Sequence, residues 1–368
     1  MAEDVRVQIL IDFQGDQELQ ANLVEMEVYE SVDSATTCRA RFAIDIDGTN
    51  FTFLDDDRLQ PGQDHLMTVL IVVDMVPTVI SHGIITERRL EIADGGAGSA
   101  MELVSTDRRI LMDRKCRGSN LGLGPAAGIV TAMLAQYGFV PQVVLFDQAV
   151  FVPLMNTLNQ GISDLALIQA LAGQHDAHFW IDWSLFPVEV AHFEATPSLT
   201  SLAGLTRTTL SANAGVGKST MGRFRSQWVS EMPNATGNLW RVDIDSGKLV
   251  GGSGPSATVP RLGDKPDGPD IECQVLSAGD LAEATRRQIA ALNDASWVVR
   301  AEAESSVRAL GSLVRPREVV TVAGVGAVDS GDYFVDSVRH RISTTDHLMN
   351  IKLRRNAVTS GILGFGGL

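Results

Sequence analysis

Residues Ala212–Ser219 come closer than any other string in this sequence to a motif with chemistry of its own. They read ANAGVGKS and fit a relaxed phosphate-loop pattern, A-x-x-x-x-G-K-S. A true phosphate loop needs a buried strand before it and a helix after it, whose N-terminus meets the phosphate. Thr208–Leu210 is a poor buried strand, and Thr220–Trp228 alternates as a strand does. We therefore interpret the string as a glycine-rich loop and keep nucleotide binding as the alternative.

Two other groups have side chains that could hold a metal ion. His175 and His178 could lie near each other at a helix end, but no third ligand is placed and the glutamate of an HExxH motif is missing. Asp55–Asp57 fits no calcium loop and is better suited to cap or solvate a turn. We expect neither a metal site nor a cofactor.

Signatures of a catalytic nucleophile are missing as well. The sequence contains no G-x-S-x-G, and Cys38, Cys116 and Cys273 are widely spaced without a CxxC pair. Carboxylates are plentiful, but a glycosidase pair cannot be picked from sequence. We assign no catalytic residue and expect that the protein is not an enzyme.

Charge and hydropathy exclude further classes. The chain has 368 residues with 45 Asp and Glu against 30 Lys and Arg, a net charge of −15 that repels phosphate backbones and disfavours specific nucleic-acid binding. The most apolar stretch, Leu66–Ile85, is interrupted by Asp74, Pro77 and His82, which argues against membrane insertion. The N-terminus lacks the pattern of a secretory signal, so we expect synthesis in the cytoplasm.

Residues 1–118 have the pattern of a small antiparallel β-barrel. Arg39–Asp47 alternates with period two, so that Ala40, Phe42 and Ile44 face one way. Leu59–Gly62 carries the Pro-Gly pair of a turn. Further strands are expected at Leu66–Val73, Val79–Ile92 and Met101–Ser105.

Residues 119–203 change to a small α+β unit. Pro125 is expected at the first position of a helix that ends at Tyr137-Gly138, where glycine takes the left-handed conformation. A second helix is expected to start near Ser163 or Asp164 as N-cap. Ala177–Trp183 and Pro187–Phe193 are typical of a hairpin.

Residues 204–368 return to strands, and we expect a second barrel there with an insertion at about 251–300. The insertion contains a loop rich in Gly, Pro, Ser and Asp, followed by a helix from Ala278 to about Asp294. The overall class is β-rich α+β, with two similar antiparallel β-barrel domains flanking the α+β unit.

A faint internal repeat links the two β regions. Near the N-terminus a turn is followed by strand Met67–Val73, a strand that begins at Gly83, and strand Met101–Ser105. Near the C-terminus a turn at Leu313–Pro316 is followed by Val319–Val322, a strand that begins at Gly331, and Met349–Leu353. Element order and spacing match, although identities mostly do not. Two generic β meanders would give the same pattern, so the repeat alone does not decide the fold.

The segment Gly331–Val358 resembles the closing segment of the phage late control D family, the baseplate hub proteins of contractile tails. It contains G-x-Y-x-V-x-S-V-x-H and an aliphatic strand that ends in Arg355-Asn356. Two more stretches resemble that family in the same order. They are the helix at Pro125–Phe139, and Asn159–Leu165 leading to Leu171-Ala172 and Phe179-Trp180.

This resemblance implies a structural role. Family members have two similar tube domains separated by an α+β domain and form homotrimers, so that three chains make a six-fold-like ring. The implied partners are the tail tube or a tube-initiator ring, a separate spike protein and baseplate wedge proteins. The implied location is the baseplate of a phage tail or contractile injection system. The apolar tail residues Ile362, Leu363 and Phe365 are candidates for docking on the spike or a neighbour, although a frayed terminus has the same composition.

Two alternatives from other classes remain at this point. One is a tail-associated enzyme, either a P-loop NTPase built around Lys218 or a cell-wall hydrolase. The other is a generic β-rich binding module that stays monomeric.

Overall fold

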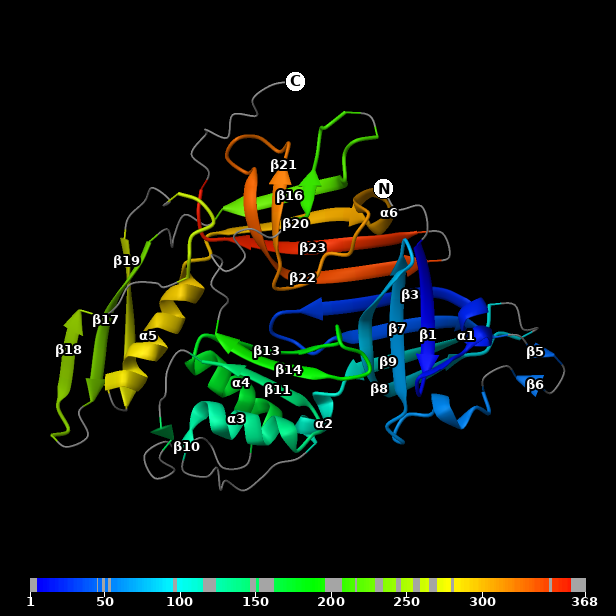
Figure 1. Ribbon diagram of the computed structural model, residues 1–368, viewed down its shortest axis with the longest axis horizontal. Coiled ribbons are helices and arrows are strands. Elements are labelled where there is room, and N and C mark those ends of the chain that lie inside the picture. Colours follow the sequence, from blue (N-terminus) through cyan, green and yellow to red (C-terminus); the bar gives the residue numbers. More distant parts are fainter. Residues whose placement is uncertain are drawn as a thin grey trace.

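The computed structural model (Figure 1) describes most of the chain. None of its described helices has the length and apolar character needed to cross a membrane. The residues that it does not describe are 1–4, 45, 48–49, 52–53, 95–97, 115–123, 146–149, 152–161, 196–206, 216, 229–233, 243–245, 254–258, 265–269, 279–280, 344–345 and 359–368.

The first β region, called unit 1 below, is built on six strands in the order β3-β4-β9-β8-β7-β1. Leu66–Val73 forms a strand as predicted, and Gly62 has the positive φ that the turn before it requires. Alternation places Ala40, Phe42 and Ile44 in the buried core. Its elements are β1 (Val5–Ile11), β2 (Gln14–Gly15), α1 (Gln17–Ala21), β3 (Leu23–Ser31), β4 (Thr37–Ala43), β5 (Ile46–Asp47), β6 (Asn50–Phe51), the 3-10 turn η1 (Asp57–Leu59), β7 (Leu66–Val73), β8 (Val76–Glu91) and β9 (Ala100–Asp107).

The α+β unit follows and packs two helices on a three-stranded sheet. Ser163 caps α4 by accepting a hydrogen bond from the Ala166 backbone, as predicted, and Gly138 has a φ of +80° after α3. Pro125 is the N-cap of α3 rather than its first residue, because its ψ of 145° is extended. The elements are α2 (Ile110–Asp113), β10 (Gly124–Pro125), α3 (Ala126–Ala135), β11 (Val140–Val144), β12 (Val150–Phe151), α4 (Asp164–Gln174), β13 (Ala177–Asp182) and β14 (Val190–Ala195).

The second β region, unit 2, has six strands in the order β16-β20-β23-β22-β21-β15. Between β16 and β20 the chain forms a separate sheet of β17, β18 and β19 with helix α5, so the expected insertion 251–300 holds β19 and α5. The elements are β15 (Thr209–Ser211), β16 (Met221–Trp228), β17 (Asn234–Val242), β18 (Leu249–Ser253), β19 (Asp270–Ala278), α5 (Leu281–Ala295), β20 (Val299–Ser306), α6 (Val307–Leu310), β21 (Val319–Ala323), β22 (Gly331–Ser343) and β23 (His347–Arg355).

The strand orders of units 1 and 2 match, which makes the internal repeat a property of the fold. The direction differs only in the last strand, because β1 is antiparallel to β7 whereas the short β15 is parallel to β21. The long strands β8 and β22 each pair along their first part with the preceding strand and along their second part with the following strand, and the pairing with the following strand contains one register shift. That shift falls at Thr86 in β8 and at Asp336 in β22. A second matching shift occurs between Leu23 and Glu25 in unit 1 and between Met221 and Arg223 in unit 2. Two bulges in equivalent places fix the alignment of the repeats residue by residue.

Units 1 and 2 share one thirteen-stranded sheet, because β3 pairs antiparallel with the second half of β22. In Figure 1, β16, β20, β23, β22 and β3 follow one another from top to bottom. The fold class is confirmed as β-rich α+β, but the described strands close neither unit into a barrel. In unit 1 the seam between β1 and β3 is spanned by α1, whose Leu19 is fully buried in the core.

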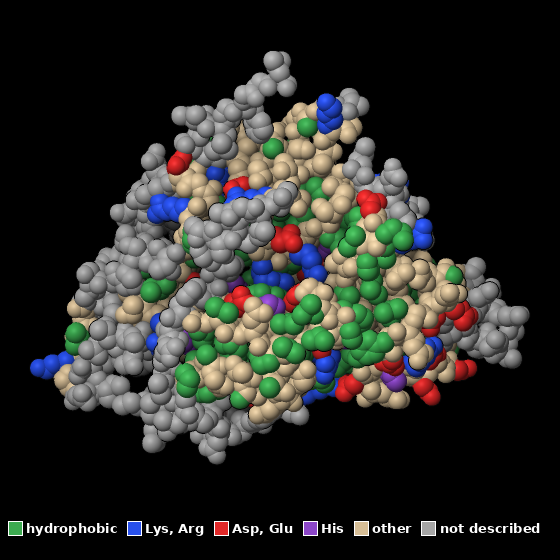
Figure 2. Space-filling model, in the orientation of Figure 1, with side chains coloured by type: hydrophobic (Ala, Val, Ile, Leu, Met, Phe, Trp, Pro, Cys, Tyr) green, Lys and Arg blue, Asp and Glu red, His purple; other side chains and the backbone are tan. Residues whose placement is uncertain are grey.

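The α+β unit is attached to both β units by arginines. Arg109, at the end of unit 1, donates hydrogen bonds to the carbonyls of Phe179 and Ser34. Arg317, ahead of β21, lies 4.6 Å from the ring centre of Trp180. Figure 2 shows charged side chains of both signs near the middle of the view, where the upper sheet faces the α+β unit.

Candidate functional site

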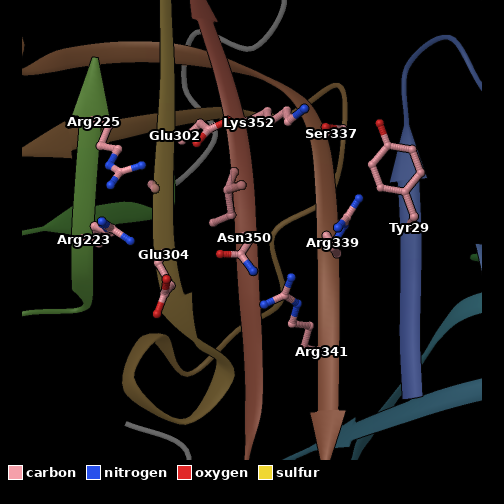
Figure 3. Close-up of a pocket in the computed structure, with 12 residues that line it drawn as sticks. Tyr29, Arg223, Arg225, Glu302, Glu304, Ser337, Arg339, Arg341, Asn350 and Lys352 are labelled. Carbon is pink, nitrogen blue, oxygen red and sulfur yellow. The ribbon is translucent and has the colours of Figure 1, made fainter. Parts of the chain in front are cut away.

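The outer face of the long sheet carries charged side chains across both units. Strand alternation puts apolar residues on the side of the two cores and charged residues on the other side. Figure 3 shows this face over unit 2, with Arg223 and Arg225 on β16, Glu302 and Glu304 on β20, and Arg339 on β22. The same hollow is also lined by Tyr29, Ser337, Arg341, Asn350, Ile351 and Lys352.

The two units differ in the sign of charge on this face. The hollow over unit 2 has five cationic side chains and two carboxylates. The matching positions of unit 1 carry five glutamates and three arginines, on β3, β4, β9 and β8. Five of the eight positions carry the opposite charge in unit 2, namely Glu25/Arg223, Glu27/Arg225, Arg39/Glu302, Arg41/Glu304 and Glu91/Arg341. Arg89 matches Arg339 and keeps its sign, whereas Glu87 and Glu102 match the uncharged Ser337 and Asn350. The residues of unit 1 are Glu25, Glu27, Arg39, Arg41, Glu87, Arg89, Glu91 and Glu102.

Ion pairs on this face are concentrated in unit 1 and at the pairing of β3 with β22, which is called the joint below. Glu27 lies 3.7 Å from both Arg339 and Arg341, across the β3–β22 joint. Arg41 contacts Glu91 at 3.0 Å, and Arg89 contacts Glu102 at 2.9 Å. Within the described part of the chain, by contrast, the arginines of β16 form no ion pair. The arginines of β16 therefore remain outside close ion pairs with any described residue, although Glu304 and Glu302 lie opposite them on β20.

Beneath the joint, on the core side, a buried carboxylate holds units 1 and 2 together. Glu30 of β3 is 2% exposed and accepts hydrogen bonds from Arg315 at 2.5 Å and from the His340 ring at 3.2 Å. Arg315 also donates to the carbonyl of Val79 in β8. Burial alone would raise the pKa of Glu30, but the positive charge of Arg315 and the hydrogen bond with His340 lower it to about 2. Glu30 is therefore a buried anion that binds three segments at the joint.

A second histidine extends this network. His347 of β23 contacts His340 at 3.0 Å between ring nitrogens and is 5% exposed. Burial, with the neighbouring His340, lowers the pKa of His347 to about 3, so this imidazole is neutral at physiological pH.

Both ends of this sheet region have open strand edges. β16 pairs with β20 on one side, and no described strand pairs with its other side. In β8, residues 87–91 pair with β9 on one side, while β7 ends at the partner of Ile84 on the other. Apolar side chains are exposed at both edges: Leu90 is 45% exposed, Ile92 52% and Trp228 53%. Exposed edges of this kind are ready templates for pairing with another chain.

The phosphate-loop string does not have the geometry that phosphate binding needs. Residues 212–219 connect β15 to β16, so a strand follows where a helix would have to begin. Lys218 is exposed, and the Asn213 amide donates to the carbonyl of Gly324 in the neighbouring β21–β22 connection. The interpretation as a glycine-rich loop is confirmed for the described residues of the string.

The remaining candidate ligands are dispersed. His175 caps the end of α4, and His178 lies on β13 with its ring 3.4 Å from Asp33. Asp56 caps η1 and pairs with Arg58, which confirms a turn-capping role. Among the described residues no cluster of three or more His, Cys, Asp or Glu side chains could hold a metal ion. The docking candidates Ile362, Leu363 and Phe365 lie outside the described residues.

Sequence reasoning missed the buried network, although a signal was present. Along β3 the alternate residues that face the core are Met26, Val28 and Glu30, so one carboxylate lies on the buried side of the strand. On β22 the same alternation places His340 between Val338 and Ile342. A charged residue among the core-facing residues of a strand indicates a buried partner, since burying an unpaired charge is costly.

Comparison with known proteins relates this fold to those of solved structures. No protein-family model matches the chain, and no curated protein matches it. A tail protein from Neisseria meningitidis superposes with a TM-score of 0.65 at 13% identity, covering 96% of this chain and 97% of the other. The 43 kDa tail protein of prophage MuSo2 from Shewanella oneidensis gives 0.60 at 11% identity, covering 95% and 98%.

This chain has the fold of phage tail proteins. The tail-protein fold extends to a type VI secretion component from Escherichia coli, with a TM-score of 0.55 at 12% identity, over 96% of this chain and 77% of that one. The expected resemblance to baseplate hub proteins is confirmed at the level of the fold, and the structural neighbours are tail and secretion-system proteins rather than enzymes.

Proposed function

We propose that the chain is a structural hub subunit of a phage tail or contractile injection system. Three copies form a homotrimeric adaptor that joins a hexameric tail tube, or its initiator ring, to a trimeric spike. The subunit is made in the bacterial cytoplasm and is assembled into the baseplate, where wedge proteins surround it. It has a mechanical role and performs no catalysis.

The observation that carries this proposal is the repeat of a six-stranded unit within one chain, joined edge to edge by β3 and β22. A three-fold assembly of such chains presents six nearly equivalent units to a six-fold tube. It also keeps features that occur once per chain, such as the sheet of β17, β18 and β19 with α5, for a three-fold partner. The mismatch in symmetry is thereby resolved inside each subunit.

The structural neighbours support a place in such a machine. The Escherichia coli type VI component is itself described as structurally similar to two phage T4 tail proteins. A Francisella complex of PdpA and VgrG contains a chain with a TM-score of 0.57 at 12% identity, over 97% of this chain and 59% of that one. These neighbours support partnership with tail and spike components.

We propose that Ile362, Leu363 and Phe365 dock on the spike protein or on a neighbouring subunit. Their apolar side chains in a glycine-rich segment suit docking into a partner surface. Replacing all three by serine should abolish co-purification with the spike subunit and leave the circular dichroism spectrum unchanged. Undiminished spike binding by that variant would rule this docking segment out.

The experiment that tests the hub itself measures solution mass by light scattering, alone and with the spike subunit, and images the particle by electron microscopy. We expect a trimer, alone or upon spike addition, with a six-fold-like ring in projection. A strict monomer under both conditions would overturn the adaptor and favour the binding-module alternative. Peptidoglycan turnover by the pure protein would instead favour the hydrolase.

A further inference from the structure

Two open strand edges of the sheet are complementary to each other. We propose that β16 of one copy pairs antiparallel with residues 87–91 of β8 in a second copy, and that this contact repeats the β3–β22 joint between subunits. This contact rests on the proposed homotrimer, in which it would join each subunit to the next and close the ring.

The repeat identifies the two edges as equivalents of the strands already joined within the chain. Because the bulges align unit 1 with unit 2, β3 corresponds to β16, and β22 corresponds to β8. β3 pairs with β22 along residues 25–31 and 337–343. The equivalent edges, on β16 and on β8 beyond Ile84, have no strand partner among the described residues. Each unit thus has the same joining surface, but only one of the two joints is formed within one chain.

The register of the contact between copies follows from the register of the internal joint. In that joint Glu27 is opposite Arg341, and Val28 is opposite His340. Transferred by the repeat, Arg225 is opposite Glu91 of the partner subunit. Ser226 is opposite Leu90 of the partner subunit, and Trp228 is opposite Arg88 of the partner subunit.

Charge on the outer face supports this pairing. Inside the chain, one glutamate of β3 lies between two arginines of β22 at 3.7 Å each. Between copies Arg225 takes the place of Glu27, and Glu91 of the partner subunit takes the place of Arg341, so the signs of this pair are exchanged. The equivalent of Arg339 is an arginine as well, Arg89 of the partner subunit, whose charge is balanced by ion pairs to two glutamates of its own chain. Within the described part of the chain Arg223 and Arg225 form no ion pair. Complementary charges across an interface set its register and disfavour wrong partners.

Apolar side chains on the core side support it independently. Trp228 and Phe224 lie opposite Val299 and Ala303 of β20, so they point to the core side of unit 2. Leu90 pairs with Met101, a core residue of unit 1. Leu90 and Trp228 are about half exposed because each core stops at an open edge. Pairing the two edges covers these side chains as Met26 and Val28 are covered at the internal joint.

Cysteine cross-linking tests the register. In the double variant Ser226→Cys with Leu90→Cys, the new thiols lie opposite each other only between copies, at a spacing that a disulfide can bridge. We expect oxidation to give covalent dimers and trimers on a non-reducing gel. The matched control is Ser226→Cys with Ala93→Cys, three residues out of register, which should stay monomeric on the gel. Equal cross-linking of both variants would overturn the proposed register.

Charge reversal tests the same contact without new covalent bonds. Arg225→Glu and Glu91→Arg should each weaken self-association about tenfold or more, measured by sedimentation, because like charges then meet at the edge. Combining both substitutions should restore association. Unfolding temperatures of the exposed single variants serve as the folding control.

The outcomes separate the joint from the proposed function. A trimer that forms without the Ser226–Leu90 cross-link and is insensitive to both reversals overturns the edge joint and leaves the hub intact. A protein that stays monomeric at its highest soluble concentration, with or without the spike subunit, overturns both. Cross-linked trimers with rescue by the double reversal support both.

Discussion

The carboxylate of Glu30 on β3 accepts a 2.5 Å hydrogen bond from Arg315, and this pair is buried where unit 1 meets unit 2. Removing one partner of a buried pair leaves the other charge uncompensated, which costs about 3–5 kcal/mol. We expect Glu30→Gln to lower the free energy of unfolding by about that amount, measured by denaturant titration. Glu27→Gln is the matched control, because Glu27 lies on the opposite, exposed face of the same strand. Its contacts at 3.7 Å contribute about 1 kcal/mol or less. Equal effects of the two variants would contradict a buried ionic joint.

Acid should weaken the same region through His347. Its pKa is about 3 in the folded protein against 6.5 for the ordinary imidazole, so the folded state resists protonation that the unfolded chain accepts. Stability from this depressed pKa is fully present above pH 6.5 and is lost as the pH falls toward 3. One such proton contributes a slope of up to about 1.4 kcal/mol per pH unit.

The measurement compares wild type with His347→Gln, unfolded by denaturant at pH values from 8 to 5. The variant should lose part of the acid slope below pH 6.5, while the two slopes agree above pH 7. His82 has a pKa lowered to about 4 by burial and by Arg108, so some acid slope remains in the variant. An identical slope in both proteins below pH 6.5 would refute a neutral buried His347.

Gly324 is expected to tolerate no side chain. A Cβ there would lie 1.9 Å from the carbonyl oxygen of Ala212, and the φ of +79° is strained for other residues. We expect Gly324→Ala to cost about 2–3 kcal/mol of unfolding free energy and to loosen the β15–β16 loop. Gly326→Ala is the control, because its φ of +100° is similar but no atom lies within 4 Å of the added Cβ. Calorimetry should give a clearly lower unfolding temperature for Gly324→Ala than for Gly326→Ala. The reverse order would exclude this close approach.

Lys218 should be dispensable. Its loop leads into β16 instead of a helix, so it lacks the backbone amides that hold phosphate groups. Titration with a fluorescent ATP analogue should give no saturable binding to wild type or to Lys218→Ala, and both should unfold at the same temperature. Saturable binding that is lost in the variant would restore the nucleotide-binding alternative.

Much of the element order was predictable because local signals fix it. Alternation and flanking turns gave the bounds of β7 correctly, and Ser163 marked the start of α4 through its capping side chain. The repeat was visible as an order of elements, but its alignment on Gly83 and Gly331 was wrong by two residues. The bulges at Thr86 and Asp336 make Ser81 the equivalent of Gly331. The two glycines serve different needs: Gly83 allows a close approach of the Thr106 carbonyl, whereas Gly331 has a φ of +138°.

The joint between the units could not be predicted from local signals. β3 pairs with a strand that begins at Gly331, and no local pattern specifies a register over such a separation. The arginine that neutralises Glu30 lies in an irregular segment before β21, where periodicity carries no information. The opposite charges at equivalent positions of the two units could not be recognised either, because this requires the residue-level alignment that only the bulges supply.

The connection between β16 and β20 has a consequence for how the protein is made. β3 and β4 are joined across residues 32–36, so their pairing closes a short loop, whereas β16 and β20 must close residues 229–298. Short loops close at lower entropic cost and contribute to faster folding. Unit 1 should therefore form first, during synthesis, and its β3 edge must wait for β22 to leave the ribosome. Glu25 and Glu27 line that waiting edge, and their charges would discourage premature pairing between nascent chains.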